Sequence, residues 1–123
     1  MPNRSDYLWV FFKWNGRVGR AVYVLAGLLA ILLPSFLLYQ VLLAPEGSPA
    51  AQFWTASFSL AFLVSLWSHL ALGAKRLHDL GKPGILSLSL FVPVVSILVF
   101  AALCVFPGNP GRNEYGERSD AAG

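Results

Sequence analysis

Ionisable side chains are most concentrated in residues 75–82, which hold four possible cations and one carboxylate. On a helix, Lys75 and Arg76 lie four and three residues before Asp79, so both can reach its carboxylate. His78 lies three residues after Lys75 and adds a group that titrates near neutral pH. This pattern is typical of two arrangements, a polar site that binds a phosphate or carboxylate and a basic helix end whose cations extend to lipid phosphates. The residues themselves leave both arrangements open.

Metal binding and nucleophilic catalysis are not expected of this group. His69 and His78 are separated by about 13 Å along a helix axis, so one chain cannot chelate an ion with both. No serine lies in a recognisable nucleophile elbow, and one neighbouring His-Asp pair does not define a catalytic triad. The single cysteine, Cys104, excludes an intrachain disulfide and a cysteine metal site. We therefore expect no enzymatic activity, no cofactor and no bound metal.

Three long windows without Asp, Glu, Lys or Arg separate the charged residues of the chain. They are residues 21–45, 47–74 and 83–111, and their strongly apolar runs are residues 21–43, 53–72 and 85–106. Each run is near the ~20 residues that a helix needs to cross ~30 Å of hydrocarbon. A globule of 123 residues has too much surface to bury three such helices. The sequence therefore predicts an all-α integral membrane helical bundle with about three transmembrane helices.

The whole chain, residues 1–123, is expected to form a single membrane domain. Residues 1–20 are aromatic and end with two arginines, which suits an interfacial amino-terminal segment. The first run, residues 21–43, exceeds the ~7–15 residues of a signal-peptide core and is expected to remain as an anchor. The second helix is expected over residues 53–80, and its length of roughly 42 Å carries the last two turns into the cytoplasmic headgroup layer. Residues 107–123 are rich in glycine and proline and predict a turn-rich tail.

The distribution of Lys and Arg predicts the orientation in the membrane. Four precede the first span, none lies between the first two, three lie between the second and third, and two follow the third. This favours a cytoplasmic amino terminus, and three full crossings then place the carboxyl-terminal tail outside. Pro93 lies within the third run and permits an alternative, in which that run is a re-entrant hairpin and the tail returns beside residues 75–79.

Three short polar motifs occur around the apolar runs. They are Gly-Arg-Val-Gly-Arg at residues 16–20, Lys-Arg-Leu-His-Asp-Leu-Gly at residues 75–81 and Gly-Arg-Asn-Glu-Tyr-Gly at residues 111–116. With these motifs, the chain resembles the small bacterial inner-membrane proteins grouped as domain of unknown function 805, over almost its whole length. The resemblance implies a compact helical domain in the bacterial inner (plasma) membrane and no established activity. The chain departs from the family at residues 83–86, which are Pro-Gly-Ile-Leu where a small residue, glycine and tryptophans are common, and at Glu117, where a proline is usual.

The resemblance also implies which side chains carry the polar motifs. They correspond here to Arg17, Arg20, Arg76, His78, Asp79, Asn113 and Gly116. Together with Lys75, all of these except Gly116 are the candidate residues for binding a ligand or lipid headgroups. We expect a non-enzymatic membrane module whose basic cytoplasmic rim contacts anionic lipid or a partner membrane protein, which includes a second copy of the chain. The formal charge of +3 is modest and the basic residues flank the apolar runs, so nucleic acid is not an expected partner.

Two other functions fit the same residues. A subunit of an oligomeric transporter or channel would line a path with the polar side chains of Gln40, His69, Arg76 and Asp79. In a purely structural role, Arg17 or Arg20 joins Asp79 and the tail in a polar cluster that fixes helix packing. An exchange of Arg76 and Asp79 would then partly restore the stability that charge reversal at Asp79 removes.

Overall fold

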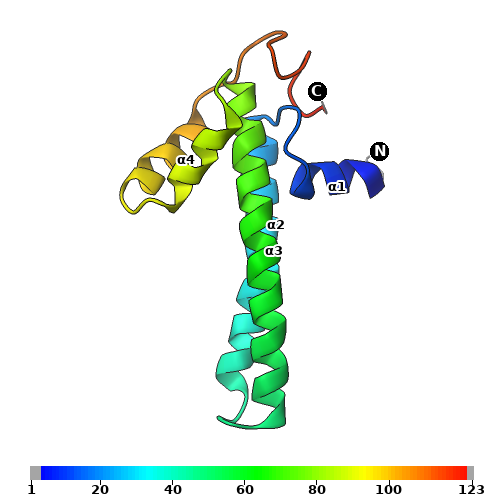
Figure 1. Cartoon of the computed structure of the whole chain (residues 1–123), viewed down its shortest axis with the longest axis vertical. Coiled ribbons are helices and arrows are strands. Elements are labelled where there is room, and N and C mark those ends of the chain that lie inside the picture. Colours follow the sequence, from blue (N-terminus) through cyan, green and yellow to red (C-terminus); the bar gives the residue numbers. More distant parts are fainter. Residues whose placement is uncertain (1–3, 122–123) are drawn as a thin grey trace.

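The computed structural model describes residues 4–121 and the side chains of residues 6–121. These residues form five helices and no strand: α1 (Arg4–Phe12), α2 (Arg20–Leu43), α3 (Pro49–Asp79), the 3-10 helix η1 (Gly84–Phe91) and α4 (Val95–Val105). The expected all-α fold is confirmed. α2 and α3 form an antiparallel hairpin along the long axis, and the remaining elements gather around one end of it (Figure 1). We call this end, where residues 13–20, 75–82 and 103–121 meet, the head.

The α2–α3 hairpin holds 17 of the 32 large hydrophobic side chains that are exposed among residues 6–121. Its helices have 24 and 31 residues, which correspond to about 36 and 46 Å. Only 17% and 22% of their apolar windows are buried inside the structure. A core helix of a soluble protein is covered on most sides, so water is a poor solvent for this hairpin. Both helices are long and apolar enough to cross a membrane.

Local signals in the connecting turn begin α3 earlier than residue 53. Gly47 has a φ of +75°, which glycine adopts without strain. Ser48 then caps the helix, because its Oγ accepts a hydrogen bond from the N–H of Ala51 at 3.1 Å. Pro49 occupies the first helical position, where its missing N–H costs nothing.

The third apolar run does not form the single helix expected over residues 85–106. It is divided into η1 and α4, which run beside each other in opposite directions next to α3 (Figure 1). Their 8 and 11 residues correspond to about 16 Å each, half of the ~30 Å of a membrane interior. The structure therefore has the folded-back arrangement, and the tail returns to the head instead of lying at the far end of the hairpin.

Pro93 and the residue after it reverse the chain between η1 and α4. Proline cannot donate a backbone hydrogen bond, so a continuous helix is interrupted there. The N–H of Val95 donates to the carbonyl of Pro93 at 2.8 Å, and Val94 between them has a φ of +69°. This is a γ-turn of the rarer, strained hand. η1 also approaches α3 closely, because a Cβ on Gly73 would lie 3.0 Å from the Leu90 side chain.

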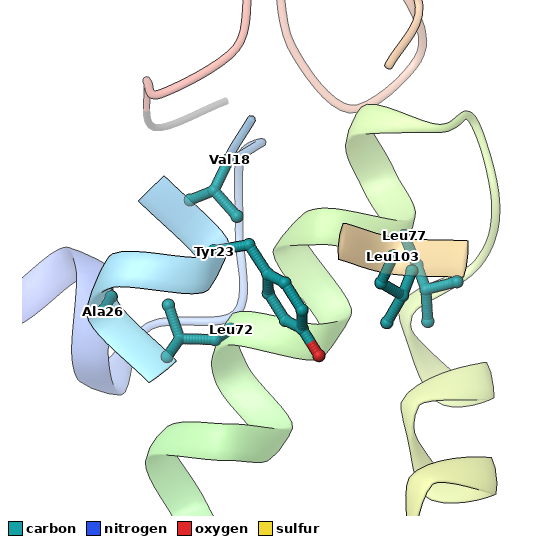
Figure 2. Close-up of a cluster of buried hydrophobic side chains, with 6 residues drawn as sticks. All are labelled: Val18, Tyr23, Ala26, Leu72, Leu77 and Leu103. Carbon is teal, nitrogen blue, oxygen red and sulfur yellow. The ribbon is translucent and has the colours of Figure 1, made fainter. Parts of the chain in front are cut away.

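The buried hydrophobic core extends from the head into the adjoining turns of α2 and α3. Its members are Val18, Tyr23, Ala26, Leu72, Leu77 and Leu103 (Figure 2). They come from the segment before α2 and from α2, α3 and α4, so four parts of the chain pack together at this level. This packing gives the polar residues of the head a fixed scaffold.

Candidate functional site

Asp79, the last residue of α3, is the centre of a buried ion cluster in the head. Its Oδ1 accepts hydrogen bonds from Arg17 Nε at 3.0 Å and from the hydroxyl of Ser119. Its Oδ2 accepts a hydrogen bond from Arg76 Nη1 at 2.7 Å. Both arginine side chains have 0% exposure and that of Asp79 has 2%. One carboxylate therefore lies between two guanidinium groups, in a place where an unpaired charge would be costly.

Arg17 uses its other donors to hold the carboxyl-terminal tail. Nη1 donates to the carbonyls of Gly111 at 2.6 Å and Gly116 at 3.2 Å, and Nη2 donates to the carbonyl of Asn109 at 2.7 Å. The N–H of Arg17 donates to the carbonyl of Ala121 at 3.1 Å. The guanidinium of Arg17 thus holds three backbone carbonyls of the tail, and its backbone N–H holds a fourth.

Arg76 and Arg20 bind carbonyl groups at the end of α4. Arg76 Nε donates to the carbonyl of Leu103 at 2.7 Å, and its Nη2 donates to that of Phe106. Arg20 Nη1 donates to the carbonyl of Val105 at 2.9 Å. Carbonyls in the last turn of a helix lack partners within the helix, and cations stabilise the negative end of the helix dipole. The two arginines therefore cap the helix that leads into the tail.

Lys75 has the same role for α1. Its Nζ donates to the carbonyls of Trp9 and Val10, near the carboxyl end of α1, and lies 4.7 Å from the centre of the Trp9 ring. The Lys75 side chain is fully buried. Its own carbonyl accepts a hydrogen bond from the N–H of Val18 at 3.2 Å. This residue thus joins α1 and the segment before α2 to α3.

His78 is enclosed by backbone and by an aromatic ring. Its Nδ1 lies 2.9 Å from the carbonyl of Gly16 and donates to it, because a carbonyl can only accept. The Tyr115 ring stacks on the imidazole at 4.0 Å with an interplanar angle of 3°. A Cβ on Gly84 would lie 2.9 Å from Nε2. The carbonyl of His78 accepts a hydrogen bond from Asn113 Nδ2 at 2.8 Å, so this residue also holds the tail.

All the side chains predicted for the site lie in the head, but with different accessibility. Arg17, Lys75, Arg76 and Asp79 are buried, His78 and Asn113 are half-buried, and Arg20 is exposed. The burial of Lys75 and Arg76 contradicts their expected contact with lipid phosphates. Their charges meet backbone carbonyls and Asp79 instead. The arrangement is that of the structural alternative, in which a polar cluster fixes packing.

Sequence reasoning missed Gly108 and Ser119. A Cβ on Gly108 would lie 1.8 Å from Oδ2 of Asp79, so only glycine allows the tail to pass the carboxylate. Ser119 supplies the third donor to Asp79. No local pattern marks either residue, because each matters only once the tail has returned to the head.

An open groove of about 840 Å³ lies on the outer side of His78 and Tyr115. Its charged lining consists of Arg112, Glu114, Glu117 and Arg118. Partial burial raises the pKa of Tyr115, and the neighbouring Glu114 raises it further, so the phenol stays protonated at neutral pH. With equal numbers of both charges, the groove has no net attraction for an anion.

Comparison with known proteins tests the family resemblance that the three polar motifs indicate. No curated protein and no solved structure matches the chain. A family model described as "Protein of unknown function (DUF805)" matches residues 11–117. That range contains Arg17, Arg76 and Asp79, whereas Ser119 lies just beyond it. The chain therefore belongs to the DUF805 family of proteins of unknown function.

Proposed function

We propose that this protein is a non-enzymatic membrane module, anchored in the bacterial inner membrane by α2 and α3, whose basic rim contacts anionic lipid headgroups. The amino terminus and the head lie on the cytoplasmic side, in agreement with the bias of Lys and Arg. The buried ion cluster keeps the head in one conformation. The contact with lipid is made by other cations than those of the cluster.

The observation that carries this proposal is the position of the exposed cations. Lys13 follows α1, Arg20 begins α2 and Lys82 follows α3, and all three side chains are exposed. Exposed apolar side chains adjoin them, with Phe12 next to Lys13 and Ile85 close to Lys82 in sequence. Cations that border apolar surface in this way meet the phosphates of a bilayer whose hydrocarbon surrounds the helices.

The transporter alternative receives less support from the geometry. It requires Arg76 and Asp79 to face a path, but both are buried and bonded to each other at the head. Their donors and acceptors serve Leu103, Phe106 and Arg17. A conducting path would have to break this cluster, so we favour the lipid-contacting module.

Lipid titration followed by native mass spectrometry tests the proposal. The purified protein is titrated with phosphatidylglycerol or with phosphatidylcholine of the same acyl chains. We expect tighter binding of phosphatidylglycerol, and the variant Lys13→Gln/Lys82→Gln should lower that preference roughly 30-fold, at ~1 kcal/mol for each cation lost. The matched control Lys13→Arg/Lys82→Arg should keep it. Equal binding of both lipids, or a preference that the Gln variant leaves unchanged, would reject the proposal.

A further inference from the structure

An apolar pocket of about 490 Å³ separates the α2–α3 hairpin from the folded-back pair of η1 and α4. Its volume falls within the ~300–1,000 Å³ of typical ligand pockets. Apolar side chains such as Leu70 and Phe100 form most of its lining. Phe91 and Ile97 also line it and are exposed, so the pocket opens sideways, where a bilayer would surround the protein.

Three polar side chains in this lining, those of Tyr23, His69 and Ser96, have no hydrogen-bond partner among residues 6–121. Tyr23 is 5% exposed, and its hydroxyl points from α2 toward the side on which Leu103 of α4 lies (Figure 2). His69 of α3 is half-buried and packs beside Gly27 of α2, where an added Cβ would lie 4.0 Å from Cε1. Among residues 6–121, neither the phenol of Tyr23 nor the imidazole of His69 has a hydrogen-bond partner.

Such groups need a partner when hydrocarbon surrounds the protein. An unpaired polar group is costly in lipid because no water can replace the missing hydrogen bond. Tyr23 lies about 4.5 Å further along α2 than Arg20, at the border of the apolar span. At this depth in a bilayer, the glycerol ester groups of a phospholipid lie between its headgroup and its acyl chains. An ester carbonyl has two lone pairs and no donor, so it suits a phenol O–H and an imidazole N–H.

We infer that this pocket binds one acyl chain of a bilayer phospholipid, whose ester carbonyl accepts hydrogen bonds from Tyr23 and His69. The acyl chain lies against the apolar lining between α3 and α4, and the headgroup extends toward the exposed Arg20. The inference rests on the proposed function in one respect, since it places the protein in a lipid bilayer. It adds the apolar pocket and the ester carbonyl to the lipid contacts of the exposed cations, of which Arg20 is one.

Comparing ester and ether lipids isolates this hydrogen bond. Purified, delipidated protein is titrated with diester phosphatidylglycerol and with its diether analogue of equal chain length, and bound lipid is counted by native mass spectrometry. We expect the wild-type protein to bind the diester about 5- to 10-fold more tightly. Tyr23→Phe keeps the ring, removes the hydroxyl and should reduce this ratio to about 2. The control Tyr39→Phe alters an exposed phenol of α2 outside the pocket and should leave the ratio unchanged.

A second variant tests occupation of the pocket itself. Ala101→Phe fills space in the lining and should weaken binding of the diester at least tenfold. An equal affinity of wild-type protein for diester and diether lipid would overturn the inference. So would displacement of lipid by an isoprenoid quinone together with no preference for the ester, since the ligand would then be a quinone.

The outcome is separable from that of the rim experiment. The ester-ether ratio compares lipids with one headgroup, whereas the rim experiment compares headgroups with one set of chains. If Lys13→Gln/Lys82→Gln leaves the headgroup preference unchanged while Tyr23→Phe lowers the ester preference, the results support the pocket and reject the rim proposal. If the Gln variant lowers the headgroup preference while Tyr23→Phe leaves the ester preference unchanged, the results support the rim proposal and reject the pocket proposal.

Discussion

Replacing Asp79 with asparagine removes the central charge of the ion cluster and keeps the shape of the side chain. Arg17 and Arg76, both fully buried, would then be adjacent cations with no carboxylate between them. Removing one partner of a buried ion pair costs about 3–5 kcal/mol of the free energy of unfolding. For a chain of 123 residues this corresponds to a fall in Tm of about 12–20 °C.

Thermal unfolding in detergent micelles, followed by near-ultraviolet circular dichroism, measures the effect. Trp9 and Trp14 lie close to the head, and Trp14 packs on Trp67 with ring centroids 5.6 Å apart, so aromatic signals report on this region. The control is Glu117→Gln, the same chemical change at an exposed carboxylate, which should alter stability by less than ~0.5 kcal/mol. A Tm of Asp79→Asn within ~2 °C of wild type would refute the assignment of Asp79 as the centre of the cluster.

Exchanging Arg76 and Asp79 distinguishes this geometry from a simple charge pair. The sequence alone led us to expect partial rescue. In the structure Arg76 also donates to the carbonyls of Leu103 and Phe106, so a carboxylate at position 76 would face oxygen atoms. We therefore expect the exchange to be no more stable than Asp79→Asn. Recovery of half or more of the lost stability would show that the α4 carbonyls are not essential partners.

Three further substitutions test other features of the structure, and a fourth prediction concerns topology. Gly108→Ala should cost about 3 kcal/mol in thermal unfolding and add little to Asp79→Asn, because its Cβ would displace that carboxylate, whereas Gly111→Ala, with open space around it, should be neutral. Lys75→Met should remove the side-chain donor from the carbonyls of Trp9 and Val10 and speed amide hydrogen exchange in α1, and unchanged exchange would contradict its docking role. Val94→Gly should raise stability by about 1 kcal/mol by relieving the positive φ, and a lower Tm would count against the strained turn. Reporters fused to the two termini should label from the same side of the membrane, and opposite sides would contradict the folded-back pair.

Most of the α2–α3 hairpin was predictable from the sequence. The first helix, expected over residues 21–43, is Arg20–Leu43 in the structure, because an uninterrupted apolar run bounded by charge is a local property. The end of α3 at Asp79 follows in the same way from Gly81 and Pro83. Spacing along one helix was likewise enough to predict the contact between Arg76 and Asp79.

Composition did not decide whether the third apolar run forms one helix or two. A continuous run of this length is compatible with one spanning helix or with two short ones, and a proline is tolerated in both. The close approach of η1 to Gly73 and the turn at Val94 select the second arrangement. The approach to Gly73 joins η1 to α3, which lies outside the third run, so the side of the tail could not be derived from the run itself.

The sequence by itself determined the chemistry that is present: apolar helices of membrane length, with cations and one aspartate where the second of them ends. Only the tertiary structure decided which cations are exposed. Lys75, Arg76 and Arg17 are buried because the backbone carbonyls that compensate their charges come from α1, α4 and the tail. Hydrophobicity and helix spacing are encoded by neighbouring residues, whereas the partner of a buried charge is chosen by packing over the whole chain.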